Sequence, residues 1–180
     1  MNSSAKPSLF DVKHSVVFMG VAGCGKSSLA SAVARAEGLP LVEGDDFHSA
    51  ANRAKMHAGI ALSDEDRDGW LSVLCEQLQM APQGIALTCS ALKKKYRDRL
   101  RRASPGLRFV FLALTREMAQ ERVAARSGHF FSADLVASQF AALEPPIDEA
   151  NVLQVDASAS VEQLERQVCA WLRTDQVEPD

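Results

Sequence analysis

The sequence has 180 residues, 47% of them hydrophobic, and this length and apolar content suit one compact domain with a sizeable core. Twenty Lys and Arg against 23 Asp and Glu give a net charge of −3, which excludes a general electrostatic attraction to nucleic acid or to an anionic membrane. No apolar run approaches the roughly 20 residues that span a bilayer, and the N-terminal arm has no signal-like apolar core. We therefore expect a soluble cytoplasmic protein with neither nucleic acid nor membrane as partner.

Strand-like apolar runs alternate with helix-like segments along the chain. The predicted strands are residues 16–20, 39–44, 84–90, 107–114 and 151–157. The predicted helices are residues 27–37, 63–80, 92–102, 116–128, 132–143 and 160–173, and a polar, amphipathic stretch covers 45–59. This alternation predicts right-handed crossovers and an α/β fold whose five-stranded parallel sheet is flanked by helices. We expect an N-terminal arm, residues 1–14, and a single domain, residues 15–175.

The stretch GVAGCGKSS, Gly20 to Ser28, lies between the first predicted strand and the first predicted helix. It fits the spacing GxxxxGK followed by Ser or Thr, in which backbone N–H groups and a helix N-terminus surround phosphate oxygens. Lys26 would bridge the β- and γ-phosphates of a nucleotide, and the Ser27 hydroxyl would coordinate Mg²⁺. The alternative, a glycine-rich turn without a ligand, does not explain why the motif, its flanks and the fold class agree.

A phosphate loop alone does not choose between a switch GTPase, a motor ATPase and a small-molecule kinase. A switch GTPase would carry Asp-x-x-Gly after its third strand and Asn-Lys-x-Asp later, and neither pattern is present at those places in the sequence. The short chain, the polar stretch after the second strand and the arginine-rich segment after the fourth instead favour a kinase. These parts would be an acceptor-binding region at about 45–70 and a small lid at about 125–134.

The polar stretch begins where the second strand ends, at the edge where open α/β sheets bind ligands. Asp45 is the first candidate to accept the proton of an attacking hydroxyl, whereas Asp46 fits a solvated loop acid or helix cap equally well. His48 could donate to a polyol hydroxyl or be a surface histidine. Asn52 and Lys55 are three residues apart and could share one face of a short helix.

Several cations could neutralise an anionic ligand, although for each one taken singly the sequence favours a solvated surface charge. Those near strand ends are Arg67, Lys93, Lys94 and Arg97. Arg122 and Arg126 lie four residues apart ahead of Gly128, a possible hinge. An arginine on a closing lid can stabilise the transferring phosphoryl group, or it can simply favour the last turn of a helix.

Five blocks in order carry a family resemblance from Val16 to Val155. They are GVAGCGKSS, GDDFHSAANRAKMHAGIALSDEDRDGWL, CSALKKKYRDRLR, RSGHFF and SQFAALEPP. On these residues the chain resembles the P-loop gluconokinases, thermoresistant-type gluconate kinases related in fold to shikimate and adenylate kinases. The resemblance implies ATP-dependent phosphorylation of D-gluconate on its 6-hydroxyl, with Mg²⁺ and a homodimer.

The residue patterns described above and the resemblance together assign residues to the site. The nucleotide would be held by Gly20, Val21, Ala22, Gly23, Cys24, Gly25, Lys26, Ser27, Ser28 and Arg122. The acceptor would be held by Asp45, His48, Asn52, Lys55, Arg67 and Lys93, and the catalytic residues would be Lys26, Asp45 and Arg126. Glu43 stands where the family often has aspartate, which puts a metal-water role there in question. Two alternatives stay open: a kinase for another small hydroxy acid such as shikimate, and an ATP-binding module without catalysis.

Overall fold

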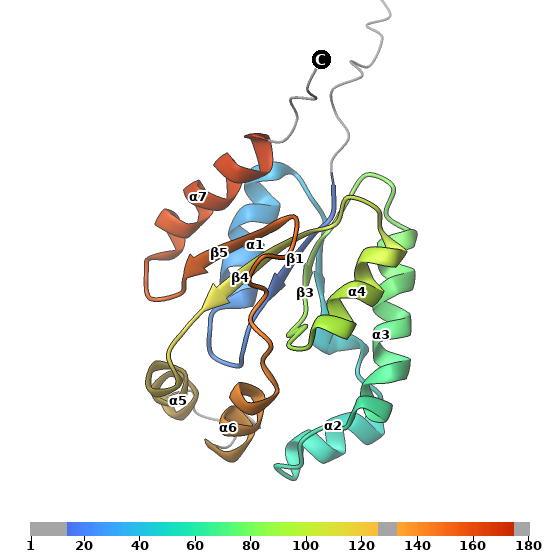
Figure 1. Ribbon diagram of the computed structural model, residues 1–180, viewed down its shortest axis with the longest axis vertical. Helices are drawn as coiled ribbons and strands as arrows, with labels where there is room; N and C mark the ends of the chain where they lie inside the picture. Colours follow the sequence, from blue (N-terminus) through green and yellow to red (C-terminus); the bar gives the residue numbers. More distant parts are fainter. Residues whose placement is uncertain (1–13, 126–132, 175–180) are drawn as a thin grey trace, which may run out of the picture.

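A computed structural model of the protein describes residues 14–125 and 133–174. Its centre is a five-stranded parallel sheet in the order β2-β3-β1-β4-β5 (Figure 1). The strands are β1 (Val16–Met19), β2 (Leu41–Glu43), β3 (Ala86–Thr88), β4 (Arg108–Ala113) and β5 (Val152–Asp156). All five were predicted. The inner strands β1, β3 and β4 are buried on both faces and appear in the sequence as continuous apolar runs, and shorter apolar runs predicted the edge strands β2 and β5.

The helices are α1 (Lys26–Glu37), α2 (Ala50–His57), α3 (Asp64–Gln79), α4 (Lys94–Ala103), α5 (Arg116–Ala125), α6 (Ala133–Ala142) and α7 (Val161–Thr174). Four of them, α1, α3, α4 and α7, cover the two faces of the sheet, and α2, α5 and α6 lie toward one end of it (Figure 1). A short 3-10 helix, η1 (Gly44–Phe47), follows β2 and was not predicted as a helix. None of the helices in the described part of the chain is long and apolar enough to cross a membrane.

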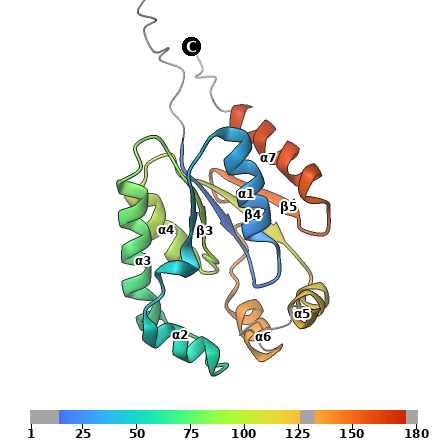
Figure 2. The same ribbon diagram turned by 180° about the vertical axis from the view of Figure 1, so that it is seen from behind.

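The alternation of side chains along β1 divides the core in two. Val16 and Phe18 pack with α1 and α7 on one face, whereas Val17 and Met19 pack with α3 and α4 on the other. Figure 1 and the reverse view in Figure 2 show the same division, with α3 and α4 opposite α1 and α7. The sheet is therefore enclosed on both faces, and its ligand-binding surface is left to the strand ends.

Local signals set the ends of two helices that shape this surface. Gly38 adopts a left-handed conformation and ends α1, as the sequence predicts. Ser63 caps α3 in a capping box, in which its hydroxyl accepts from the N–H of Asp66 and the Asp66 carboxylate accepts from the N–H of Ser63. The capped first turn of α3 lies toward the end of the sheet where α2, α5 and α6 also lie (Figures 1 and 2).

Candidate active site

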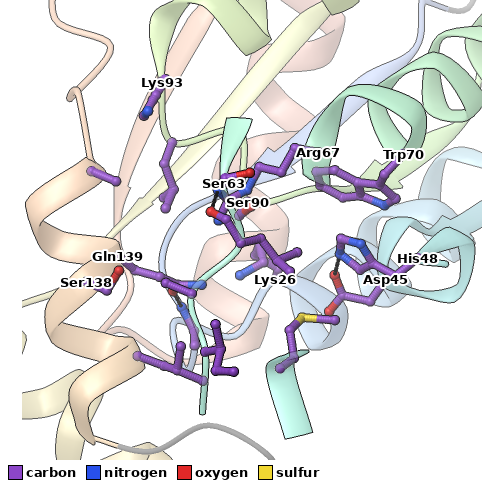
Figure 3. A pocket seen from close by; sticks show the side chains of 18 of the residues that line it. Lys26, Asp45, His48, Ser63, Arg67, Trp70, Ser90, Lys93, Ser138 and Gln139 are labelled. Carbon is purple, nitrogen blue, oxygen red and sulfur yellow. Dashed lines mark hydrogen bonds and ion pairs between the residues drawn. The ribbon is translucent and has the colours of Figure 1, made fainter. Parts of the chain in front are cut away.

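A cavity of about 600 Å³ opens at the carboxyl ends of the strands. Its lining comes from the loop between β1 and α1, from η1, α2 and α3, from the loop after β3, and from α6. Figure 3 shows Lys26 between Gln139 on one side and Asp45 with His48 on the other. Segments that are more than 100 residues apart in the chain, such as Lys26 and Gln139, thus form one site.

The loop between β1 and α1 has the backbone shape of a phosphate cradle. Gly25, at the N-cap of α1, has a φ of 95°, in the left-handed region that glycine adopts without strain. Lys26 Nζ donates to the carbonyl oxygens of Gly20 and Val21, each at 3.0 Å, so its ammonium group lies within the loop. The N–H groups at the start of α1 face the same cavity, which makes this end of the helix suited to an anion.

One cradle N–H is already bonded to a residue that the sequence did not single out. The backbone N–H of Ala22 donates to Oε1 of Gln139 on α6 at 2.6 Å. Gln139 lies within the SQFAALEPP block, but its partner is 117 residues away in the chain, and no local pattern predicts such a pair. The structure therefore adds Gln139 to the residues of the nucleotide side.

Ser27 and Glu43 form an oxygen-rich pair beside the cradle. Ser27 Oγ donates to Oε2 of Glu43 at 3.0 Å, and Thr88 Oγ1 donates to the same carboxylate oxygen at 2.6 Å. Thr88 Oγ1 also accepts from the N–H of Gly44 at 3.2 Å, which connects this pair to the start of η1. The Glu43 carboxylate thus lies beside the Ser27 hydroxyl at the start of α1.

Asp45 and His48 lie together on the acceptor side of the cavity. The η1 turn places Oδ1 of Asp45 3.7 Å from Nε2 of His48, and the His48 ring stacks on Trp70 with centroids 4.4 Å apart (Figure 3). Trp70 Nε1 donates to the carbonyl of Gly44 at 2.7 Å, so a residue of α3 stabilises the η1 turn. His48 is buried, which resolves the open question of whether it is a surface histidine.

Asn52 and Lys55 share one face of α2, as predicted, but they lie behind the cavity. Asn52 is buried and its Nδ2 donates to the Asp66 carbonyl at 2.8 Å, while Lys55 Nζ donates to both carboxylate oxygens of Asp66. These bonds to Lys55 hold the pKa of Asp66 below its usual value. Both side chains thus fasten α2 to the start of α3.

Arg67 and Lys93 form a cationic wall on the acceptor side. Their charged groups lie 5.9 and 5.8 Å from the ring centroid of Tyr96. Lys93 Nζ donates to Asp64 at 2.8 Å, and Lys95 and the Tyr96 hydroxyl donate to the same carboxylate. These three donors, Lys93 first, hold the pKa of Asp64 far below its usual value. Burial, together with the Asp64 hydrogen bond, raises the pKa of Tyr96 to about 12.

The remaining predicted cations have different surroundings. Arg122 donates to the carbonyl oxygens of Gly23 at 3.4 Å and Ala157 at 2.8 Å, so it links the phosphate loop to the segment after β5. Lys94 pairs with Asp98 on the surface. The expectation that Arg97 is a solvated cation near a strand end is wrong, because its side chain is fully buried and bonded to Glu149. Arg126 and Gly128 lie outside the described residues.

A glycine cradle at the start of α1, in a parallel sheet of the order β2-β3-β1-β4-β5, defines the P-loop class of nucleotide-binding α/β proteins. The sequence model of a family described as "AAA domain" matches residues 16–146. The chain is 41% identical over 165 residues to the probable gluconokinase of Schizosaccharomyces pombe (strain 972 / ATCC 24843), covering 86% of each chain.

Two further comparisons agree. The chain is 40% identical to the thermoresistant gluconokinase of Escherichia coli (strain K12), covering 83% of this chain and 87% of that one. A crystal structure of a gluconokinase from Sinorhizobium meliloti 1021 superposes with a TM-score of 0.83 at 41% identity, covering 89% of this chain and 92% of the other. The protein belongs to the "AAA domain" family and to the gluconokinase family, and its fold is that of the P-loop kinases.

Proposed function

We propose that the protein transfers the γ-phosphoryl group of ATP to the 6-hydroxyl of D-gluconate, giving 6-phospho-D-gluconate and ADP. The observation that carries the proposal is the single cavity that the phosphate loop shares with Asp45, His48, Arg67 and Lys93. An ATP-binding module without catalysis would not need these acceptor-side groups. Family membership favours gluconate over other hydroxy acids.

On the donor side, the N–H groups from Gly20 to Ser28 would bind the phosphates. The Lys26 ammonium group would stabilise the negative charge that develops on the transferring phosphoryl group. Arg122 would keep the loop in shape through its bond to the Gly23 carbonyl. We further propose that residues 125–134 act as a lid and that Arg126 contributes a second cation and helps to exclude water from the site. The in-line geometry would then depend on loop and lid together.

On the acceptor side, Asp45 would orient the 6-hydroxyl and accept its proton, and the region 45–70 would bind the sugar acid. Arg67 and Lys93 are cations at the same wall, which suits the carboxylate at the other end of an extended gluconate. His48 would take part on the acceptor side through its place beside Asp45. Asn52 and Lys55 would act through the position of α2, because their side chains bond to Asp66.

The residues beside the phosphate loop fit Mg²⁺, which prefers oxygen ligands and keeps part of its coordination for nucleotide phosphates and water. Ser27 Oγ and the Glu43 carboxylate supply such oxygens 3.0 Å apart, and we propose that they hold the ion directly and through water. When bound, Mg²⁺ would neutralise charge on the transferring phosphate. From the family resemblance we also propose a cytoplasmic homodimer.

A substrate panel tests the proposed function. Purified protein with ATP and Mg²⁺ is assayed for ADP release with gluconate, shikimate and nucleoside monophosphates as acceptors. We expect turnover with gluconate and at least about 100-fold lower kcat/KM with the others. A site that hydrogen-bonds several substrate hydroxyls leaves its own polar groups unpaired when an acceptor lacks matching hydroxyls. A higher kcat/KM with another acceptor would show that gluconate is not the preferred substrate. Tight ATP binding without turnover of any acceptor would favour the non-catalytic module.

Lys26→Ala tests the donor side. We expect kcat to fall by about 100-fold or more, because a charge that stabilises the transferring group is removed from the site. The fold should be intact, since Lys26 bonds only within a local loop. Circular dichroism and thermal unfolding provide the control, and wild-type turnover in this variant would contradict the assignment of the phosphate loop.

A further inference from the structure

The surroundings of His48 determine which of its ring nitrogens carries the proton. The residue is 7% exposed, and the stack on Trp70, with ring planes inclined by 16°, covers one ring face. Of the two ring nitrogens, Nδ1 lies 3.5 Å from Nδ2 of Asn52, and Nε2 faces Asp45 (Figure 3). The polar chemistry of the imidazole therefore depends on these two neighbours.

The orientation of the Asn52 amide is set by a third residue. Nδ2 of Asn52 lies 2.8 Å from the backbone carbonyl oxygen of Asp66, and a carbonyl oxygen can only accept. The atom at this position must therefore be the amide nitrogen. Its second hydrogen is available to Nδ1 of His48, which then acts as the acceptor. A neutral imidazole that accepts at Nδ1 carries its proton on Nε2.

The charge around the ring favours the neutral form. Burial lowers the pKa of His48; the Asp45 carboxylate acts in the opposite direction, and Arg67 and Arg53 lower the pKa further. These charged groups belong to three elements near the ring: Asp45 to η1, Arg53 to α2 and Arg67 to α3. At neutral pH the ring is thus a hydrogen-bond donor at Nε2 and cannot take up a proton there.

We propose that His48 is a positioning residue that donates from Nε2–H to the Asp45 carboxylate and is not the proton acceptor of the reaction. This inference rests on the proposed function, in which Asp45 accepts the proton of the sugar hydroxyl. The Asp45 side chain is 82% exposed, so little else restricts its rotamer. At 3.7 Å the two atoms are slightly beyond hydrogen-bond distance, and a small rotation of Asp45 closes the gap when the acceptor is bound.

The protonation pattern is measured directly on the uniformly ¹⁵N-labelled full chain by long-range ¹H–¹⁵N NMR, with His48 signals assigned by their loss in His48→Gln. We expect Nε2–H and unprotonated Nδ1 in the wild type at neutral pH. Asn52→Asp replaces the donor by an acceptor and should move a proton onto Nδ1. A proton on Nδ1 in the wild type, or no change in Asn52→Asp, would overturn the inference.

The positioning role is tested by a pair of variants. His48→Phe keeps an aromatic ring against Trp70 but has no donor, whereas His48→Gln places an N–H near the position of Nε2. We expect kcat to fall about tenfold to a hundredfold in His48→Phe, with partial recovery in His48→Gln and an unchanged KM for ATP. His57→Gln is the matched surface control. A rise in the KM for gluconate alone, with kcat unchanged, would show that His48 does not position the Asp45 carboxylate.

The two proposals fail in different ways. If wild-type protein phosphorylates gluconate but either of the His48 tests gives the contrary result, only the present inference is wrong. If the wild type phosphorylates no acceptor, the proposed function is wrong and the positioning role fails with it. In that case the Nε2–H form in the NMR spectrum still tests the hydrogen-bond pattern of His48 and Asn52.

Discussion

Gly44 shows how a single residue positions the acceptor side of the site. Its N–H donates to Thr88 Oγ1, and its carbonyl accepts from Trp70 Nε1, so β2 passes into η1 against β3 on one side and α3 on the other. A Cβ atom at this position would lie 2.2 Å from the Thr88 carbonyl oxygen. Only glycine permits this approach, and Asp45 follows it directly.

Gly44→Ala should lower the free energy of unfolding by about 1–3 kcal/mol, because the added methyl group forces η1 away from β3. It should also reduce kcat with gluconate, since Asp45 moves with the turn. Gly69→Ala is the matched control: an added Cβ there meets nothing within 4 Å, and alanine in the interior of α3 should stabilise by about 0.5–1 kcal/mol. Urea unfolding measures both variants, and equal stabilities would contradict the packing argument.

At the scale of elements, α6 joins the phosphate loop through Gln139. The bond from the Ala22 N–H to Gln139 Oε1 takes up a donor that the nucleotide phosphates would use. Gln139 also lines the cavity together with Ser138 and Leu135 of the same helix. We therefore expect that a negative charge introduced at position 139 would weaken nucleotide binding more than acceptor binding.

Gln139→Glu should raise the KM for ATP about tenfold or more, because the carboxylate retains the acceptor for the Ala22 N–H and repels the phosphates at short range. The KM for gluconate should change much less. Gln167→Glu, on the exposed side of α7, adds the same charge away from the cavity and should leave both constants unchanged. Steady-state kinetics decide, and equal KM values for ATP in the two variants would show that Gln139 does not control the cradle.

At the scale of the whole molecule, a buried ion cluster joins α4 to the loop before β5. Glu149 accepts from Arg97 Nε at 3.0 Å and lies 2.8 Å from Arg101 Nη2. Arg97 Nη1 also donates to the carbonyl oxygens of Ala91 and Leu92, at 2.9 and 3.1 Å. The cluster thus holds the segment that leads into the cationic wall of the cavity.

Glu149→Gln should lower the free energy of unfolding by about 3–5 kcal/mol, because it leaves the buried Arg97 without a counter-charge. Asp98→Asn, which removes a partly exposed partner of Lys94 and Arg101, should cost less than about 1 kcal/mol. Chemical denaturation at neutral pH compares the two variants. Similar losses in both would contradict the importance of burial.

Low pH should reduce the difference in unfolding free energy between the wild type and Glu149→Gln. Burial opposes ionisation of Glu149, but the hydrogen bonds from Arg97 and Arg101 outweigh it and lower its pKa below the ordinary value of 4.5. The stabilisation by ionised Glu149 is therefore complete above pH 4.5 and is lost as the pH falls through the lower pKa of the folded state. The stability gap between wild type and Glu149→Gln should narrow below pH 4.5, and a constant gap would contradict the assignment.

Much of the fold and part of the candidate site could be predicted locally. The strands, the end of α1 at Gly38 and the cap of α3 at Ser63 depend on neighbouring residues, and the structure confirms all of them. Arg97 was misjudged because six of the ten residues of α4 are basic, and the sequence does not show which of them faces the interior. Gln139 was missed because its partner lies on a distant loop.

The class of the protein could be predicted from the sequence: apolar runs specify the parallel sheet, and GVAGCGKSS specifies the phosphate loop, because both depend on backbone geometry within a few residues. The residues that meet this loop could not be predicted without the folded structure. Packing of Trp70 beneath η1 brings Asp45 and His48 to the cavity, and Asn52 and Asp66 together determine where the His48 proton lies. Such contacts join residues from separate elements, so they exist only once the chain has folded.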